Sequence, residues 1–205
     1  YLSSKKDLLK EHVICGYNLN CVGDERAYSH VESRCGNNLS DIALKSALIN
    51  FKNVFYYSFL QRGSDERQYC SPGIDLPICT FCRSKFGKYP EYHSSKDNFD
   101  VVTAKGLQGS FEIIKIIIDS LELGIYPRIN ILGEPQLGKR GLYPNTSKLF
   151  YKGKHPAQLR MDIIAHCDGV TSVFEIANKL SINLSKILEE VKLLESHNLL
   201  EFVGD

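Results

Sequence analysis

Residues 62–77 read RGSDERQYCSPGIDLP, and residues 92–97 read YHSSKD. The first stretch is a turn crowded with acids that runs into a segment rich in proline and glycine. The second is a polar loop that carries a single histidine, His93. A folding core requires none of these features, whereas binding and catalytic residues are often placed on loops that a rigid scaffold positions. We therefore expect both stretches to line a site.

Length and composition are those of an ordinary globular protein with room for one and a half to two domains. The chain has 205 residues, of which 43% are hydrophobic and 24% charged, and its formal net charge is +1. A charge so close to zero gives no general electrostatic reason to expect nucleic acid as a partner. The sequence contains no run of 18 apolar residues, so we expect no membrane span.

The seven cysteines indicate a reducing compartment. Their odd number and irregular spacing fit free thiols better than a disulfide framework, so we expect a cytoplasmic protein. Cys79 and Cys82 form a CxxC motif, but no second CxxC or suitably spaced histidine pair completes a zinc knuckle. We interpret this motif as structural or incidental.

Residues 1–124 alternate between strand and helix patterns, which predicts an α/β layer architecture. Strands are expected from the apolar and β-branched residues at 13–22, 54–60 and 74–81. Because the second of these is rich in aromatic residues, we expect it to be a buried strand. Amphipathic helices are predicted at residues 38–51, capped by Asn38 or Ser40, and at 103–123.

Residues 125–157 contain four prolines and four glycines and are predicted to be a connector with turns. Beyond them, residues 158–205 show three short helical patterns and a terminal strand, Leu200–Val203, and so resemble a winged helix-turn-helix domain. Ser172 and Glu175 have the spacing of a capping box. This segment has four Lys and Arg against eight Asp and Glu, so we expect it not to bind DNA, whose phosphates attract cations.

The two quoted stretches resemble the last third of the di-zinc aminopeptidase family, which carries a Ser-Asp-rich segment and a terminal His-[Ser/Thr]-x-x-Asp loop. Residues 62–73, together with 134–144 (EPQLGKRGLYP), are closer still to a bacterial aminopeptidase-like subgroup found with surface-polysaccharide genes. That subgroup ends in a winged helix. The resemblance covers nearly the whole chain. It implies the second half of a zinc-exopeptidase-like α/β/α sandwich in residues 1–124, followed by a small winged helix-turn-helix domain.

The resemblance implies a metal-dependent hydrolase of peptide or amide bonds, in which His93 is a zinc ligand. The nearby carboxylate of Asp97 could accept the second ring N–H of His93 and fix its tautomer, or it could equally cap the turn before Val101. The resemblance also implies an acidic zinc ligand at the carboxyl end of a strand. Asp24 lies at such a position, and Glu25 remains an alternative. The residues expected to bind the substrate are Asp65, Glu66, Arg67 and Tyr69.

A co-catalytic zinc pair needs about five or six protein ligands and a carboxylate base. The family takes a His-x-Asp pair and its general base from the first half of the domain, and residues 1–124 contain no His-x-Asp. We therefore expect the base upstream of Tyr1, two zinc ions in the intact protein, and no activity in this chain alone. The alternative is a non-catalytic interaction module or winged-helix regulatory protein that retains the fold. We expect a small peptide or amide substrate, no nucleic acid and no membrane as partners; a homo-oligomer remains open.

Overall fold

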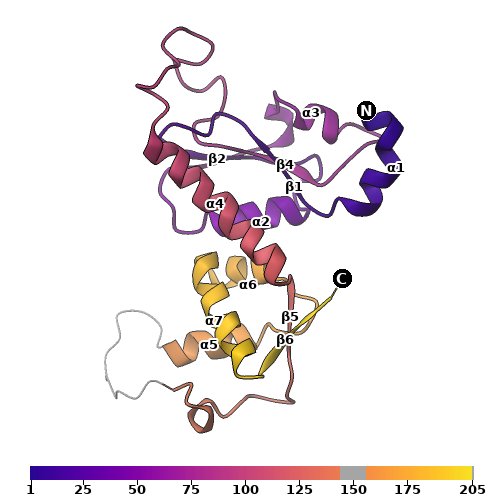
Figure 1. Cartoon of the computed structure of the whole chain (residues 1–205), viewed down its shortest axis with the longest axis vertical. Coiled ribbons are helices and arrows are strands. Elements are labelled where there is room, and N and C mark those ends of the chain that lie inside the picture. Colours follow the sequence, from indigo (N-terminus) through magenta and orange to yellow (C-terminus); the bar gives the residue numbers. More distant parts are fainter. Residues whose placement is uncertain (144–155, 205) are drawn as a thin grey trace. The chain divides into compact units, whose positions relative to one another are not determined.

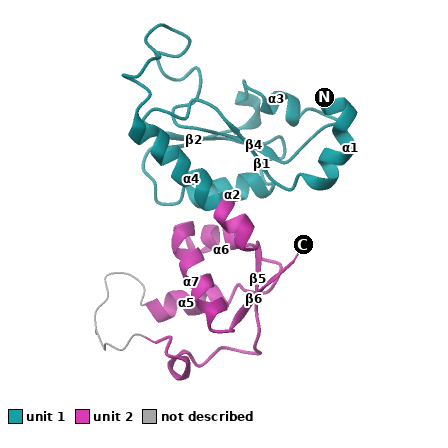
Figure 2. Cartoon of the chain, viewed as in Figure 1, with its two compact units in different colours: residues 1–117 teal, residues 118–205 magenta. Residues whose placement is uncertain are grey.

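The structure is a computed structural model that describes residues 1–143 and 156–204. It divides into two compact units, unit 1 at residues 1–117 and unit 2 at residues 118–205, and the boundary falls inside the long helix α4 (Ala104–Leu123) (Figure 2). The other elements of unit 1 are α1 (Leu2–His12), β1 (Gly16–Leu19), β2 (Tyr28–Val31), α2 (Leu39–Ala47), β3 (Val54–Tyr57), η1 (Phe59–Gln61), α3 (Glu66–Tyr69) and β4 (Ile78–Cys82).

Unit 1 is built on a four-stranded mixed sheet with the strand order β1-β4-β2-β3. Figure 1 labels three of these strands, β1, β4 and β2. The pairs β1–β4 and β2–β3 are parallel, and β2 runs antiparallel to β4. Leu19 at the end of β1 lies opposite Phe81 of β4, so the segments that follow these two strands leave the same edge of the sheet. Those two segments carry Asp24 and Ser84, which meet as described below.

The sheet and the helices of unit 1 share an apolar core. Its fully or almost fully buried side chains include Val31, Ala43, Leu44, Ala47, Leu48, Cys79, Phe81, Ile113 and Ile117. Asn38 caps α2 by accepting a hydrogen bond from the backbone amide of Asp41, as the sequence predicted. All seven cysteines are free, and Cys79 and Cys82 lie buried within β4.

The prediction of a buried strand at residues 54–60 was wrong in one respect. β3 does form there, but it is the edge strand of the sheet, and Phe55 and Tyr56 are 50% and 53% exposed. An aromatic, β-branched run marks a strand without stating how many of its faces are covered. The sequence patterns also missed α1 and the central strand β2.

Unit 2 includes the end of α4. Its other described elements are the helices α5 (Pro156–Ile164), α6 (Val173–Leu180) and α7 (Leu184–Ser196), a short 3₁₀ turn η2 (Leu137–Arg140), and an antiparallel ribbon of β5 (Tyr126–Ile129) and β6 (Leu200–Val203). The capping box at Ser172 and Glu175 is confirmed. The predicted connector thus begins with a strand, and its residues 144–155 lie outside the described residues. Within the described residues, no helix is long and apolar enough to cross a membrane.

Candidate functional site

Asp24 and Asp97 line one pocket of about 350 Å³ in unit 1. We call it the edge pocket, because the segment that follows β1 forms one of its walls. The residues that line it are Asn20, Cys21, Val22, Gly23, Asp24, Tyr89, Tyr92, Asp97, Val101, Val102 and Leu107. Open α/β sheets bind ligands in crevices outside the carboxyl ends of their strands, so this pocket occupies the expected place for a site.

Asp24 is only 4% exposed, and protein donors hold its carboxylate. Its Oδ1 accepts hydrogen bonds from the backbone amide of Arg26 at 2.9 Å and from the Ser84 hydroxyl at 2.8 Å. Its Oδ2 accepts one from the Ser84 amide at 2.7 Å. Asp24 therefore ties the segment after β1 to the segment after β4. A carboxylate has about four lone-pair sites, so one site on Oδ2 remains for a metal.

Helix α4 holds the same segment from the other side. A Cβ atom added at Gly106 would lie 1.9 Å from the carbonyl oxygen of Gly23 and 2.8 Å from that of Asp24. Only glycine permits such a close approach of two backbones. The amide of Thr103 also donates to the Gly23 carbonyl at 2.9 Å. Backbone contacts and hydrogen bonds together fix the position of Asp24.

His93 lies in the exposed loop that forms the other wall of the edge pocket. Its φ of +58° is in the left-handed region, which is uncommon for residues other than glycine. The ring stacks on Tyr92 at a centroid distance of 4.0 Å, and Tyr92 packs edge-on against Tyr89 at 5.6 Å. The Tyr89 hydroxyl donates to Asp97 at 3.2 Å. His93 and Asp97 thus share one aromatic support, and no hydrogen bond joins them in the described structure.

A bidentate ion pair anchors this loop to the segment after Asp24. Arg26 donates from Nη1 and Nη2 to the two carboxylate oxygens of Glu91, at 2.9 and 3.0 Å. These hydrogen bonds hold the pKa of Glu91 below its usual range. The pair is partly exposed, so its contribution to stability is small. Its effect on the site is to fix one end of the His93 loop.

Glu66, predicted to bind substrate, is instead a fully buried anchor between α3 and the sheet. Its carboxylate accepts hydrogen bonds from the amides of Gly63 and Ser64, from the Asn18 side chain and from the Thr80 hydroxyl, all within 3.0 Å. Burial raises the pKa of Glu66, but these donors outweigh it and hold the pKa below its usual range. The other three residues of that set, Asp65, Arg67 and Tyr69, do not line the edge pocket either.

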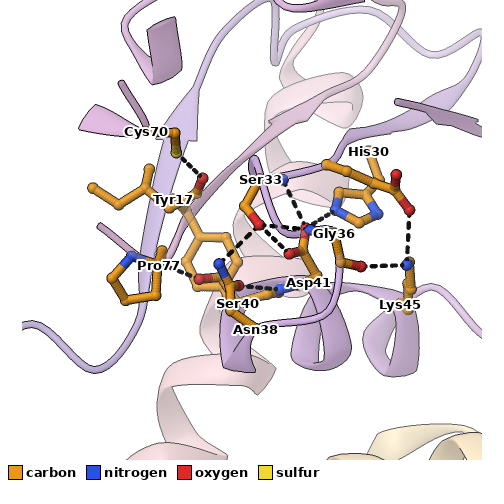
Figure 3. Close-up of polar contacts among 12 residues, drawn as sticks. Tyr17, His30, Ser33, Gly36, Asn38, Ser40, Asp41, Lys45, Cys70 and Pro77 are labelled. Carbon is orange, nitrogen blue, oxygen red and sulfur yellow. Dashed lines mark hydrogen bonds and ion pairs between the residues drawn. The ribbon is translucent and has the colours of Figure 1, made fainter. Parts of the chain in front are cut away.

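A buried polar network around Asp41 was not predicted from the sequence (Figure 3). Asp41 Oδ1 lies 2.9 Å from Nε2 of His30 and accepts a hydrogen bond from the Ser33 amide at 3.0 Å, while Oδ2 accepts one from the Ser33 hydroxyl at 2.5 Å. Burial raises the pKa of Asp41, and the hydrogen bonds from His30 and Ser33 lower it to a net value below the usual range. The network joins β2 and the loop after it to the first turn of α2.

His30, Asp41 and Cys79 form the one group in the described residues in which three potential ligand atoms lie within 4.8 Å of one another. Burial raises the pKa of the Cys79 thiol well above its ordinary value, and metals bind the thiolate rather than the thiol. The Asp41 carboxylate is already used by His30 and Ser33. We therefore interpret this group as a structural network. By the same measure, no three-ligand group forms at the edge pocket in the described part of the chain.

One His-x-Asp sequence does occur in unit 2, at His166 and Asp168. The Asp168 carboxylate accepts hydrogen bonds from the amides of Val170 and Thr171 and from the Thr171 hydroxyl, at 2.7–2.9 Å. These contacts form the turn before α6. His166 and Asp168 therefore belong to the segment between α5 and α6, and the Asp168 carboxylate serves the turn there rather than a ligand pair.

Comparison with known proteins matches both parts of the chain to protein families. Residues 1–124 match the family described as a domain of unknown function (DUF4910), and residues 124–202 match a winged helix-turn-helix family. The chain is 35% identical over 145 residues to a protein of Clostridium acetobutylicum whose name describes polysaccharide biosynthesis and an aminopeptidase-like domain. That match covers 70% of this chain and 33% of the relative.

One solved structure shares the fold of this chain. A crystal structure described as that of a peptidase from Clostridium acetobutylicum superposes with a TM-score of 0.81 at 28% identity. The superposition covers 98% of this chain and 44% of that one. An aminopeptidase from Aneurinibacillus sp. strain AM-1 gives a TM-score of 0.44 at 18% identity, over 55% of this chain and 26% of that one. The chain thus spans about a third of the curated relative and less than half of the first solved structure.

Proposed function

Since this chain belongs to the family described as a domain of unknown function (DUF4910), with a winged helix-turn-helix segment after it, we propose that it is the carboxyl-terminal part of a metal-dependent hydrolase of the aminopeptidase type. The substrate would be a peptide or a small amide. Two zinc ions would supply an activated water for attack on the carbonyl carbon. The mixed α/β fold, which matches that of a peptidase, is consistent with this assignment.

The observation that carries the proposal is the geometry of the edge pocket. Asp24 follows the first strand of a parallel pair and is hydrogen-bonded to Ser84, which follows the second. The His93 loop forms the opposite wall through Tyr89, Tyr92 and Asp97. This brings residues distant in sequence to the edge of the sheet where α/β enzymes bind their ligands.

In this proposal His93 supplies an imidazole ligand, and the stack on Tyr92 limits the orientations of its ring. Asp24 positions the pocket wall and offers a metal only the remaining site on Oδ2. The general base and the other ligands come from parts of the whole protein beyond this chain, since a zinc pair needs about five or six ligands. The isolated chain should accordingly hydrolyse nothing, even with added zinc.

For unit 2 we propose a role in packing or protein interaction rather than in DNA binding. The helix that would enter the major groove, α7, exposes Glu189 and Glu195. Its Lys186 is engaged with Glu189 at 2.9 Å, and Glu190 forms a buried pair with Arg160 at 2.7 Å. Affinity for DNA depends on cations that meet phosphates, and this surface supplies few that are free of acidic neighbours.

A non-catalytic module that retains the fold is the second candidate, and it is favoured by the three protein hydrogen bonds that occupy most of the Asp24 carboxylate. The two candidates predict different metal contents for the full-length protein. A hydrolase should bind close to two zinc ions per chain and release the amine from an aminoacyl amide. A module should contain no stoichiometric zinc and show no hydrolysis.

The test of the ligand role is His93→Ala in the full-length protein, with His12→Ala, an exposed histidine of α1, as the matched control. Loss of a direct ligand should weaken zinc binding by more than about 100-fold, since even residues that only orient a ligand contribute 10–100-fold. Elemental analysis after dialysis against a chelator measures the zinc, and thermal unfolding verifies the fold. Equal zinc contents in the two variants would rule out His93 as a ligand.

A further inference from the structure

A second pocket of unit 1, about 440 Å³ in volume, is rich in cations. We call it the arginine pocket. Its charged lining residues are Arg26, Lys52, Arg83 and Lys105 with the acids Glu25 and Glu112. It shares no lining residue with the edge pocket. The volume lies in the range of about 300–1,000 Å³ that is typical of small-molecule sites.

Arg83 is the unusual member of this set, because it is 4% exposed. Its Nε donates to the carbonyl oxygen of Ala27 at 2.7 Å, and Nη1 donates to that of Gly106 at 3.2 Å. The guanidinium lies over the Tyr28 ring at 3.9 Å from the centroid. In the described part of the chain, no carboxylate forms an ion pair with Arg83. A buried charge without a counter-ion is costly, so this arrangement requires an explanation.

The acids of the pocket are engaged elsewhere. Glu25 pairs with Lys105 at 2.8 Å and accepts a hydrogen bond from the Thr103 hydroxyl at 2.8 Å. Glu112 accepts a hydrogen bond from Gln108 at 2.9 Å. Arg26 is paired with Glu91. The hydrogen bonds from Lys105 and Thr103 and, to a smaller extent, the charge of Arg83 lower the pKa of Glu25. Glu25 is therefore an acidic neighbour of Arg83, but its oxygens are taken by Lys105 and Thr103. Among the described residues, Arg83 and Lys52 are the cations of the pocket that form no ion pair.

Helix α4 makes room for the guanidinium. A Cβ atom added at Gly109 would lie 2.6 Å from Nη1 of Arg83 and 3.0 Å from the Tyr28 hydroxyl. A glycine in the middle of a helix is destabilising relative to alanine. The position of Arg83 at the pocket wall therefore depends on a residue that the helix itself does not favour.

We propose that the arginine pocket binds the anionic group of a small ligand, a phosphate or a carboxylate, against Arg83 and Lys52. The guanidinium has five N–H donors, and the two backbone carbonyls use only two of them. The remaining donors suit a planar or tetrahedral oxyanion, which Arg binds in a fixed geometry and Lys approaches as a point charge. The ligand would form the direct ion pair that Arg83 does not make with any of the described residues.

The test uses the 205-residue chain, with inorganic phosphate and acetate as separate probes in titration calorimetry at low ionic strength. We expect saturable binding of one ion per chain for at least one probe, weakened by added chloride. Phosphate alone would identify a phosphate group, and acetate alone a carboxylate. If neither probe binds saturably, the proposal is wrong.

Variants locate the site. Lys52→Met should weaken binding of the probe at least about tenfold, because it removes a charge-assisted contact, whereas Lys5→Met on the exposed face of α1 makes the same change in net charge and should have no effect. Gly109→Ala should also weaken binding, through displacement of Arg83. Arg83→Met should abolish it; if that variant does not fold, the comparison of Lys52→Met with Lys5→Met remains decisive. Equal losses in these two lysine variants would contradict the proposal.

Discussion

Four acidic residues of unit 1 fall into two groups that the fold treats in opposite ways. Asp24, Asp41 and Glu66 are buried, and each accepts at least three hydrogen bonds from protein donors. Asp97 is exposed on the His93 loop and accepts one, from Tyr89. The buried group joins segments of the fold, whereas the exposed one keeps most of its lone pairs for other partners.

This contrast has a simple physical origin. A carboxylate transferred from water to the protein interior loses its hydration and is tolerated only if donors replace it. The same donors lower the pKa of Asp41 and Glu66. An acid in an unusual motif is therefore evidence for a site only after its donors have been counted. Substitution of Asp by Asn at three positions tests this rule in order of decreasing effect.

Asp41→Asn should be the most damaging. The asparagine side chain keeps the volume of the aspartate but has one acceptor oxygen in place of two. Its NH₂ group would therefore face a donor of His30 or Ser33, and no hydrogen bond could form there. We expect the free energy of unfolding to fall by about 3 kcal/mol, in the range for a broken buried charge network. Urea denaturation at pH 7 measures it. Asp7→Asn on the exposed helix α1 is the control and should change stability by less than about 0.5 kcal/mol.

The pH dependence follows from the direction of the pKa shift. Because the pKa of Asp41 is lower in the folded state, its stabilising contribution is present above the unfolded pKa and is lost as the pH falls through the folded value. The difference between wild type and Asp41→Asn should therefore shrink as the pH falls below about 4. A difference that stays constant down to pH 2 would contradict this account.

Asp24→Asn should have an intermediate effect, about 1–2 kcal/mol, since the hydrogen bonds that it loses come from neutral donors. The side-chain NH₂ of the asparagine would replace one carboxylate oxygen. In place of Oδ1 it would face the backbone N–H of Arg26 and the Ser84 hydroxyl, and in place of Oδ2 it would face the backbone N–H of Ser84. In Asp24→Asn, the hydrogen-exchange rate of the Ser84 backbone amide should rise more than the rates of the backbone amides in α1. Ser84→Ala removes only one donor and should cost less than Asp24→Asn. If Ser84→Ala and Asp24→Asn lower the free energy of unfolding equally, the hydrogen bonds from the backbone amides to Asp24 contribute little.

Much of the framework could be predicted from local sequence signals. The cap at Asn38, the capping box at Ser172 and the long amphipathic helix before Gly124 are encoded by neighbouring residues, and the structure contains all three elements. The strand β2 was missed because its residues, Tyr28–Val31, include a buried serine and histidine. His30 pairs in the core with Asp41 of α2, a partner that no local pattern reveals.

The candidate site was predicted in part for the same reason. Asp24 and Asp97 do line one pocket, because parallel strands bring the segments after them to one edge. Spacing could not show that Asp24 and Glu66 are buried among donors, since those donors are mostly backbone amides and distant hydroxyls. The buried charge of Arg83 was missed too, because its surroundings come from β4, α4 and the loop before β2.

Asp97→Asn should have the smallest effect on folding, less than about 0.5 kcal/mol, because the carboxylate is exposed and loses at most one contact with Tyr89. The same variant in the full-length protein should nevertheless lower hydrolysis of an aminoacyl amide by about tenfold, since Asp97 steadies the tyrosine pair on which His93 stacks. Asp100→Asn, another exposed acid of the loop, is the matched control and should change neither quantity. A stability loss above 1 kcal/mol would place Asp97 with the buried acids. Unchanged hydrolysis would show that His93 does not depend on this support. Asp97 would then differ from the buried acids only in its exposure to solvent.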